Sequence, residues 1–304
     1  MFPAGPGPRV GVVLGGDVLL GTGSEVVDLE AAGFDFGGNA AAVLHRLSVE
    51  PAFRARLSEA VAGTKERHAW EEISLVAPVA SPPSILGIAR NYADHIAEMG
   101  GERPDVQTWF TKQPTAVVGN GEGIEIPRVS DQVDYEGELG VVIGRAGRHI
   151  PVERAREFIG GYTVINDVSV RDWQRAAPTM LMGKSFDTHA PMGPWIVTPD
   201  QVPDASNLRI VTRVNGEVRQ DGTTADLIFT VDEMIAHLSA AFTLTPGLVL
   251  ATGTPAGVGA ASRPPRWLTP GDVVSISIEG VGTLTNPVVA EPEHAAGTTK
   301  SPAS

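Results

Sequence analysis

The sequence predicts a mixed α+β fold, rich in β-strands, in which a small N-terminal α/β domain precedes a larger domain. Glycine (35) and proline (24) make up about a fifth of the 304 residues, against about 12 % in average proteins. This density of turn-forming residues favours many short strands. Apolar residues make up 42 % of the chain, enough for a sizeable core. Pro78, Pro82 and Pro83 mark the boundary between the two domains.

The N-terminal domain is expected to span residues 1–80. Its apolar runs predict a hairpin over 9–20 that turns at Gly15-Gly16, a strand over 26–29, helices over 39–47 and 51–62, and a strand over 73–76. A proline begins the second helix and a glycine follows its end, as is typical of helix termini.

The larger domain is expected to span residues 81–290, followed by a disordered tail of small and polar residues over 291–304. Apolar runs predict strands over 85–89, 139–143, 162–165, 248–251, 273–278 and 282–289, and a short helix over 151–159. Asn215-Gly216 is the clearest hairpin turn, within 208–218. Thr230 and Glu233 form a capping box before a helix whose apolar residues follow helical spacing.

Charge and cysteine content exclude several classes of function. The formal net charge of −13 argues against binding nucleic acid or an anionic membrane, because both require a basic surface. The sequence contains no cysteine, which excludes disulfides and thiolate chemistry. The first residues lack the pattern of a signal peptide, and no apolar run reaches membrane-spanning length. We therefore expect a soluble cytoplasmic protein.

Two carboxylates stand at the mouth of an apolar run that ends at Gly144. Glu136 and Glu138 lie two residues apart, so on a strand both side chains would point to one face. Like charges this close repel unless a cation lies between them, and carboxylates are the ligands of hard divalent ions such as Mg2+. Asp167 ends a second apolar run and could supply a third oxygen ligand. The alternative interpretation is a solvated strand end without a ligand.

Lysine is scarce, which makes each remaining lysine informative. The sequence has four lysines among 23 basic residues, the other 19 being arginine. A lysine that persists where arginine serves elsewhere is a candidate for a specific role, although genome composition could produce the same bias. We expect the ammonium group of Lys184 to point into the cleft that holds the carboxylates.

His95 and Glu98 form a possible acid–base pair. On a helix they are i, i+3 neighbours, close enough for the carboxylate to orient the imidazole. The alternative interpretation is a solvated surface pair.

Six motifs, in one order along the chain, resemble those of the fumarylacetoacetate hydrolase family. They are Asn91-Tyr92 with His95 and Glu98, then residues 134–139 (DYEGEL), 166–172 (NDVSVRD), 184–187 (KSFD), 252–255 (TGTP) and 280–287 (GVGTLTNP). The resemblance covers about residues 85–289. It implies a β-roll, usually preceded by a small N-terminal domain, and a homodimer. It also implies Mg2+ or Mn2+ as cofactor and a small-molecule 2-oxo or 1,3-diketo acid as substrate.

The resemblance further implies a role for individual residues. By this resemblance the metal ligands are Glu136, Glu138 and Asp167; the catalytic residues are His95, Glu98 and Lys184; and the substrate-binding residues are Arg90, Tyr92, Gln174 and Thr254. Arg90 resembles in particular the acylpyruvase and oxaloacetate decarboxylase subgroup. Ala89 departs from the glycine common at that position in the family.

Our first hypothesis is a divalent-metal-dependent hydrolase that cleaves a C–C bond in acylpyruvate-type diketo acids. Cleavage leaves an enolate that Lys184 can stabilise, and His95 with Glu98 can activate the water. The alternatives are an isomerase, tautomerase or decarboxylase of 2-oxo acids such as oxaloacetate or 2-hydroxydienedioates, which would not need the pair. A catalytically silent member is a third possibility, but a scaffold has no use for clustered carboxylates in a cleft.

Overall fold

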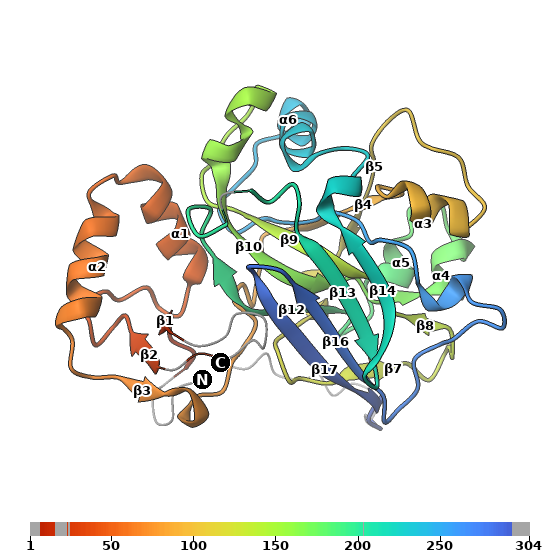
Figure 1. The fold of residues 1–304 in the computed structure, drawn as a ribbon, viewed down its shortest axis with the longest axis horizontal. Helices are drawn as coiled ribbons and strands as arrows, with labels where there is room; N and C mark the ends of the chain where they lie inside the picture. The colour runs from red at the N-terminus through yellow and green to blue at the C-terminus, as the bar shows by residue number, and fades with distance from the viewer. Residues whose placement is uncertain (1–6, 16–22, 24, 203, 294–304) are drawn as a thin grey trace.

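The computed structural model describes residues 7–15, 23, 25–202 and 204–293, and confirms a strand-rich mixed α+β fold (Figure 1). The second half of the expected N-terminal hairpin, residues 17–20, lies outside the described residues, as does most of the expected tail, 294–304. The division of the chain into domains stays a prediction.

The N-terminal part is a three-stranded antiparallel sheet covered by two helices. Its strands are β1 (Gly11–Leu14), β2 (Glu25–Asp28) and β3 (His68–Ala69), and its helices are α1 (Ala40–Val49) and α2 (Phe53–Gly63). The predicted strand at 73–76 is wrong. A 3₁₀ turn at Trp70–Glu72 directs the chain away from β2, and residues 73–76 pair with no described strand.

Two larger sheets form the rest of the fold. The first has seven strands in the order β5 (Thr108–Lys112), β4 (Ile85–Ala89), β15 (Val249–Ala251), β9 (Gly137–Ile143), β10 (Ile159–Asn166), β12 (Ala190–Val197) and β6 (Val117–Val118). The second has five strands in the order β14 (Glu217–Thr223), β13 (Arg209–Val214), β16 (Val273–Ile278), β17 (Gly282–Ala290) and β7 (Ile124–Ile126). A short ladder joins β8 (Val133–Asp134) to β11 (Ser169–Val170).

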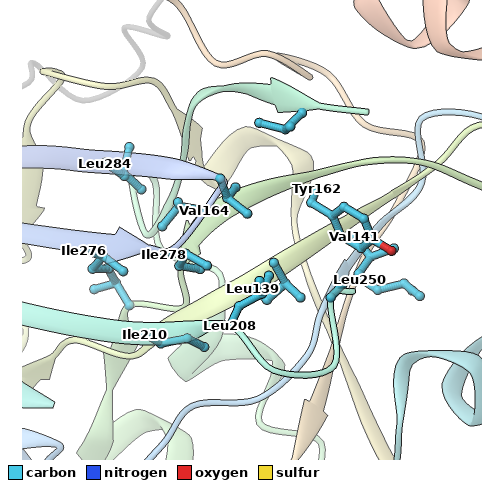
Figure 2. Packing of buried hydrophobic residues seen from close by; sticks show 14 of the residues in the cluster. Leu139, Val141, Tyr162, Val164, Leu208, Ile210, Leu250, Ile276, Ile278 and Leu284 are labelled. Carbon is cyan, nitrogen blue, oxygen red and sulfur yellow. The ribbon is translucent and has the colours of Figure 1, made fainter. Parts of the chain in front are cut away.

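The main core lies between these two sheets. Figure 2 shows Leu139 and Val164 of the first sheet facing Ile276 and Leu284 of the second. β9 and β10 are buried along their whole length, which explains why both read as continuous apolar runs instead of alternating ones. β16 alternates between buried and more accessible residues, as a strand with one face on the core does.

Beyond the N-terminal part, the described residues form four α-helices, most of them short. They are α3 (Ala93–Glu98), α4 (Arg171–Ala176), α5 (Leu181–Lys184) and α6 (Val231–Ala241). The helix expected over 151–159 is a 3₁₀ helix at Val152–Phe158. The capping box of Thr230 and Glu233 is confirmed at the start of α6. The Asn215-Gly216 hairpin is confirmed between β13 and β14.

The N-terminal part is packed against the larger part. His45 Nδ1 of α1 lies 3.1 Å from the Gly144 carbonyl oxygen at the end of β9. The rings of Trp70 and Trp195 meet edge to face, with 5.5 Å between their centroids. Gly144 directly follows β9 and Trp195 lies in β12, so the N-terminal part packs against the seven-stranded sheet, which carries the candidate site.

Candidate metal and acid–base site

A cavity of about 280 Å³ opens where β9 begins and β10 ends. The three short helices α3, α4 and α5, at the right of Figure 1, each contribute to its wall, together with β4, β5 and the loop after β15. Strand ends and short helices thus bring residues from distant parts of the chain to one place.

The register of β9 and β10 brings three carboxylates together. Ile165 is paired with Glu138 and Asn166 with Gly137, so Asp167, just after β10, lies beside Glu136, just before β9. One oxygen from each of Glu136, Glu138 and Asp167 lies within 4.8 Å of the other two, and all three side chains are buried. The backbone makes this arrangement firm, because the Asp167 N–H donates to the Glu136 carbonyl at 2.9 Å.

Three buried cations surround these carboxylates. Lys184 Nζ, at the end of α5, lies 2.5 Å from Glu136 Oε2 and also donates to Asp167 Oδ2. Lys112 Nζ, at the end of β5, donates to Asp167 Oδ1 at 2.6 Å. Arg171, the first residue of α4, bonds Glu136 Oε1 at 2.7 Å and Asp134 Oδ2 at 2.8–2.9 Å.

The three cations leave one negative charge without a partner. Four buried carboxylates (Asp134, Glu136, Glu138 and Asp167) face three buried cations (Lys112, Arg171 and Lys184), a formal balance of −1. This charge falls on Glu138, which among the described residues accepts only the Gly253 N–H, at 2.7 Å.

The pKa values reflect this imbalance. Burial opposes the ionisation of Glu136, but the charges of Arg171 and Lys184 outweigh it and hold its pKa well below its usual range. Burial raises the pKa of Glu138 well above its usual range, and the charges of Asp167 and Glu136 add to the effect. Glu138 is therefore the carboxylate that most requires an additional positive charge.

The donor set fits a hard divalent cation. All three donors are carboxylate oxygens, and oxygen ligands of Mg2+ or Ca2+ lie about 2.0–2.6 Å from the ion, so two ligands of one ion are at most about 5 Å apart. The mutual distance of 4.8 Å or less meets this limit. A divalent ion would also turn the local charge from −1 to +1, which suits an anionic ligand.

His95, one member of the acid–base pair, lines the same cavity, and Glu98 is bonded to it. His95 Nδ1 is 2.8 Å from Glu98 Oε1, and the Gly257 N–H donates to Glu98 Oε2 at 2.9 Å. Glu98 is thus fixed on both oxygens, and because a carboxylate only accepts, a neutral His95 donates to it through Nδ1. In this tautomer Nε2 carries the lone pair, and His95 lines the cavity together with Glu136, Glu138 and Asp167.

Three of the four expected substrate-binding residues line this cavity, namely Arg90, Gln174 and Thr254. Arg90 has a φ of 57°, an uncommon conformation for a residue other than glycine and one that often occurs at functional sites. Tyr92 is fully buried and is not among the residues that line the cavity. The substrate-binding roles stay predictions.

The sequence patterns did not assign roles to Lys112, Arg171 or Asp134. Lys112 is fully buried against Asp167, and the scarcity of lysine that drew attention to Lys184 applies to it equally. Arg171 and Asp134 fall within the family motifs, but no local pattern reveals that they bond each other across 37 residues.

His189 does not line the cavity, and its environment predicts a loss of stability in acid. Its Nε2 lies 2.8 Å from the Glu125 carbonyl oxygen, and burial lowers its pKa to about 3. In the unfolded chain the pKa is about 6.5, so between that pH and about pH 3 a proton binds to this residue in the unfolded state and not in the folded state. At pH 4.5 the free energy of unfolding should therefore have lost about 2.7 kcal/mol through this residue alone.

Urea unfolding in EDTA at pH 7.5 and 4.5 tests this expectation. His189→Gln retains an N–H donor and cannot be protonated, so its loss between the two pH values should be smaller by about 2.7 kcal/mol. His237→Gln, at an exposed position of α6, is the control and should lose as much as the wild type. Parallel curves for His189→Gln and the wild type would contradict the assignment.

Comparisons with known proteins place this arrangement among enzymes. Residues 84–289 match the family described as Fumarylacetoacetate (FAA) hydrolase C-terminal. An uncharacterised protein of Staphylococcus aureus (strain USA300) is 43 % identical over 217 residues, which cover 71 % of this chain and 72 % of that protein.

No described helix is both long and apolar enough to cross a membrane.

The solved structures that resemble this fold include two that are named as enzymes. A 5-carboxymethyl-2-hydroxymuconate delta-isomerase from Mycobacterium smegmatis is 42 % identical, with a TM-score of 0.67, over 76 % of this chain and 87 % of that one. A maleylpyruvate hydrolase from Sphingobium sp. SYK-6 is 31 % identical, with a TM-score of 0.78, over 94 % of this chain and 97 % of that one.

Proposed function

The chain belongs to the fumarylacetoacetate hydrolase family, and on that basis we propose that it is a divalent-metal-dependent hydrolase that cleaves a C–C bond of acylpyruvate-type diketo acids. The family consists of enzymes that act on small organic acids. The observation that carries the proposal is the His95–Glu98 pair, in which His95 lines the same cavity as the carboxylates and Lys184. Hydrolysis requires an activated water, and the pair provides the base.

In the proposed reaction His95 removes a proton from water through Nε2, and the hydroxide adds to the distal carbonyl carbon of the substrate. Glu98 stabilises the imidazolium that forms, because its carboxylate lies 2.8 Å from Nδ1. The C–C bond between the distal carbonyl and the methylene then breaks, and its electron pair passes to the pyruvate fragment as an enolate. The products are a carboxylic acid and, once the enolate carbon takes up a proton, pyruvate.

Lys184 is the proposed stabiliser of the developing negative charge. Its ammonium group lies in the cavity wall and already bonds two carboxylates, and their charges, with burial opposing them, raise its pKa. It therefore stays a cation and can donate a hydrogen bond to the enolate oxygen. A divalent ion held by Glu136, Glu138 and Asp167 would supply Lewis acidity and a template for the 2-oxo carboxylate.

A substrate panel tests the proposal directly. Purified protein should consume acylpyruvates in the presence of Mg2+ or Mn2+, with release of pyruvate and one equivalent of the carboxylic acid. EDTA should stop the reaction, and added metal should restore it. Release of pyruvate without the acid, or an unchanged rate in EDTA, would contradict the proposal.

Glu138→Gln should separate metal binding from folding. The variant removes the carboxylate that carries the unpartnered charge, so the metal-free protein should be at least as stable as the wild type. Metal affinity should fall by more than the roughly 10–100-fold typical of residues that only support a ligand. Thermal unfolding with and without Mg2+ measures both effects, because a bound ion raises the midpoint. Glu59→Gln, at an exposed position of α2, is the control.

An isomerase is the alternative, because the Mycobacterium smegmatis relative at 42 % identity is named as one. Isomerisation or decarboxylation would use the metal and Lys184 but would not need a hydroxide.

We further expect a cytoplasmic homodimer. Light scattering on the purified protein tests the dimer, which a mass near that of one chain, 31.8 kDa, would contradict.

A further inference from the structure

A closed ring of hydrogen bonds encloses Gly137, the residue between Glu136 and Glu138. The Gly137 N–H donates to Gln220 Oε1 at 3.0 Å, and Gln220 Nε2 donates to Thr254 Oγ1 at 2.7 Å. The Thr254 hydroxyl closes the ring by donating to the Gly137 carbonyl at 2.9 Å. Gln220 Nε2 also donates to the Pro255 carbonyl at 2.8 Å. The Gln220 amide is thus bonded at both ends.

The ring is almost fully buried, with only Thr254 at the wall of the cavity. Gln220 is 1 % exposed and Thr254 is 4 % exposed. Buried networks whose members are all satisfied are rigid, because any displacement leaves a polar group without a partner. Both peptide groups of Gly137 are therefore held in place, and each of them leads directly to one of the two glutamates.

A bulge in the hairpin aims Gln220 at this position. Thr212 of β13 pairs with Gln220, but the next residue, Arg213, pairs with Val218, which leaves Arg219 as an extra residue in β14. A bulge of this kind redirects the side chains that follow it. Val218 is exposed while Gln220 is buried. Gln220 thus reaches from the five-stranded sheet to β9 of the seven-stranded sheet.

The residues packed around Gly137 leave no room for a side chain at this position. A Cβ atom on Gly137 would lie 2.3 Å from Thr212 Oγ1, a distance at which something has to shift. Because Gly137 has no side chain, the five-stranded sheet can approach β9 closely enough for the Gln220 side chain to bond the Gly137 N–H. A second support lies next to the ring, where the Glu136 N–H donates to Asn166 Oδ1 at 3.0 Å.

We propose that Gln220 is a positioning residue for the divalent cation: through the ring it fixes the separation of the Glu136 and Glu138 carboxylates. The inference rests on the proposed function, in which these glutamates are ligands. It also assigns a different role to Thr254. The hydroxyl has a single proton, and Gly137 receives it, so Thr254 acts on the geometry of the ligands instead of donating to the substrate.

Titration of the substrate-free protein with Mn2+, followed by electron paramagnetic resonance, tests the inference without an activity assay. Gln220→Leu and Thr254→Val should each weaken Mn2+ binding by about 10-fold, the lower end of the range for residues that support a ligand. Thr254→Ser retains the hydroxyl and should bind like the wild type. The double variant should bind no more weakly than Gln220→Leu alone, since one break already opens the ring.

Thr224→Val is the matched control. Thr224 is also buried, its hydroxyl also donates to a carbonyl (Ala205, 2.8 Å) and accepts an N–H (Leu208, 2.8 Å), and it lies just after the same hairpin. This variant should bind Mn2+ like the wild type. An equal loss in Thr224→Val would mean that any buried threonine supports binding by stabilising the fold, and would overturn the inference.

The outcomes separate this inference from the proposed function. If the wild type binds no Mn2+, the metal site itself is wrong. If the wild type binds Mn2+ and Gln220→Leu, folded by circular dichroism, binds it equally well, only the role of Gln220 is wrong. Should Gln220→Leu fail to fold, Thr254→Val and Thr254→Ser decide: equal binding by these two variants overturns the ring as a positioning device.

Discussion

His95→Ala should abolish the cleavage of acylpyruvates, by roughly the 10²–10⁴-fold expected for the loss of general base catalysis. Glu98→Gln should have a similar effect, because the pair acts as a unit: Glu98 fixes the imidazole through Nδ1, and the Gly257 N–H fixes Glu98. Neither residue contacts the carboxylate triad by a hydrogen bond among the described residues, so metal affinity and KM should change little. Steady-state kinetics at saturating Mg2+ measures the effect.

The same variants distinguish hydrolysis from the alternative reactions. Decarboxylation of oxaloacetate, if the protein catalyses it, should fall less than cleavage, because it needs no hydroxide. His237→Ala, at an exposed position of α6, and Glu59→Gln, on α2, are the matched controls and should retain full activity. Wild-type rates of acylpyruvate cleavage in both pair variants would exclude the proposed hydrolase mechanism.

Lys184→Met should lower kcat by about 10²–10³-fold, the typical cost of removing one donor that stabilises a developing oxyanion. Metal affinity should hold or rise, because the ammonium group bonds the same carboxylates that would bind the ion. Without metal the variant should be less stable, since breaking a buried ion pair costs about 3–5 kcal/mol. Mg2+ should restore much of this stability by neutralising the same carboxylates.

Kinetics and thermal unfolding of one preparation, with and without Mg2+, measure both consequences. Lys65→Met replaces an exposed lysine after α2 and should change neither. A Lys184→Met enzyme with full activity would remove Lys184 from the mechanism. A variant whose stability did not respond to Mg2+ more strongly than the wild type would show that the lysine does not share its carboxylates with the ion.

The sequence alone determined the features that depend on neighbouring residues. A two-residue turn selects a hairpin, and a capping box begins a helix, so the Asn215-Gly216 hairpin and the start of α6 were predicted correctly. The apolar runs of β9 and β10 predicted two buried strands, because a run of apolar residues is also a pattern of neighbours in the sequence. The apolar residues at 73–76 also fit the pattern of a strand, but this prediction was wrong. A strand needs a partner strand, and no residue nearby in the sequence specifies one.

Only the tertiary structure decided which groups balance the carboxylates. Lys112 is 55 residues from Asp167, Lys184 is 48 residues from Glu136, and Gln220 is 83 residues from Gly137. The contacts depend on sheet register, on a bulge in β14 and on the packing of α5 against β5 and β11, none of which leaves a periodic pattern in the sequence. Side-chain types reveal which chemistry is available, but only the long-range pairing of strands shows that Glu138 is the carboxylate left without a cation.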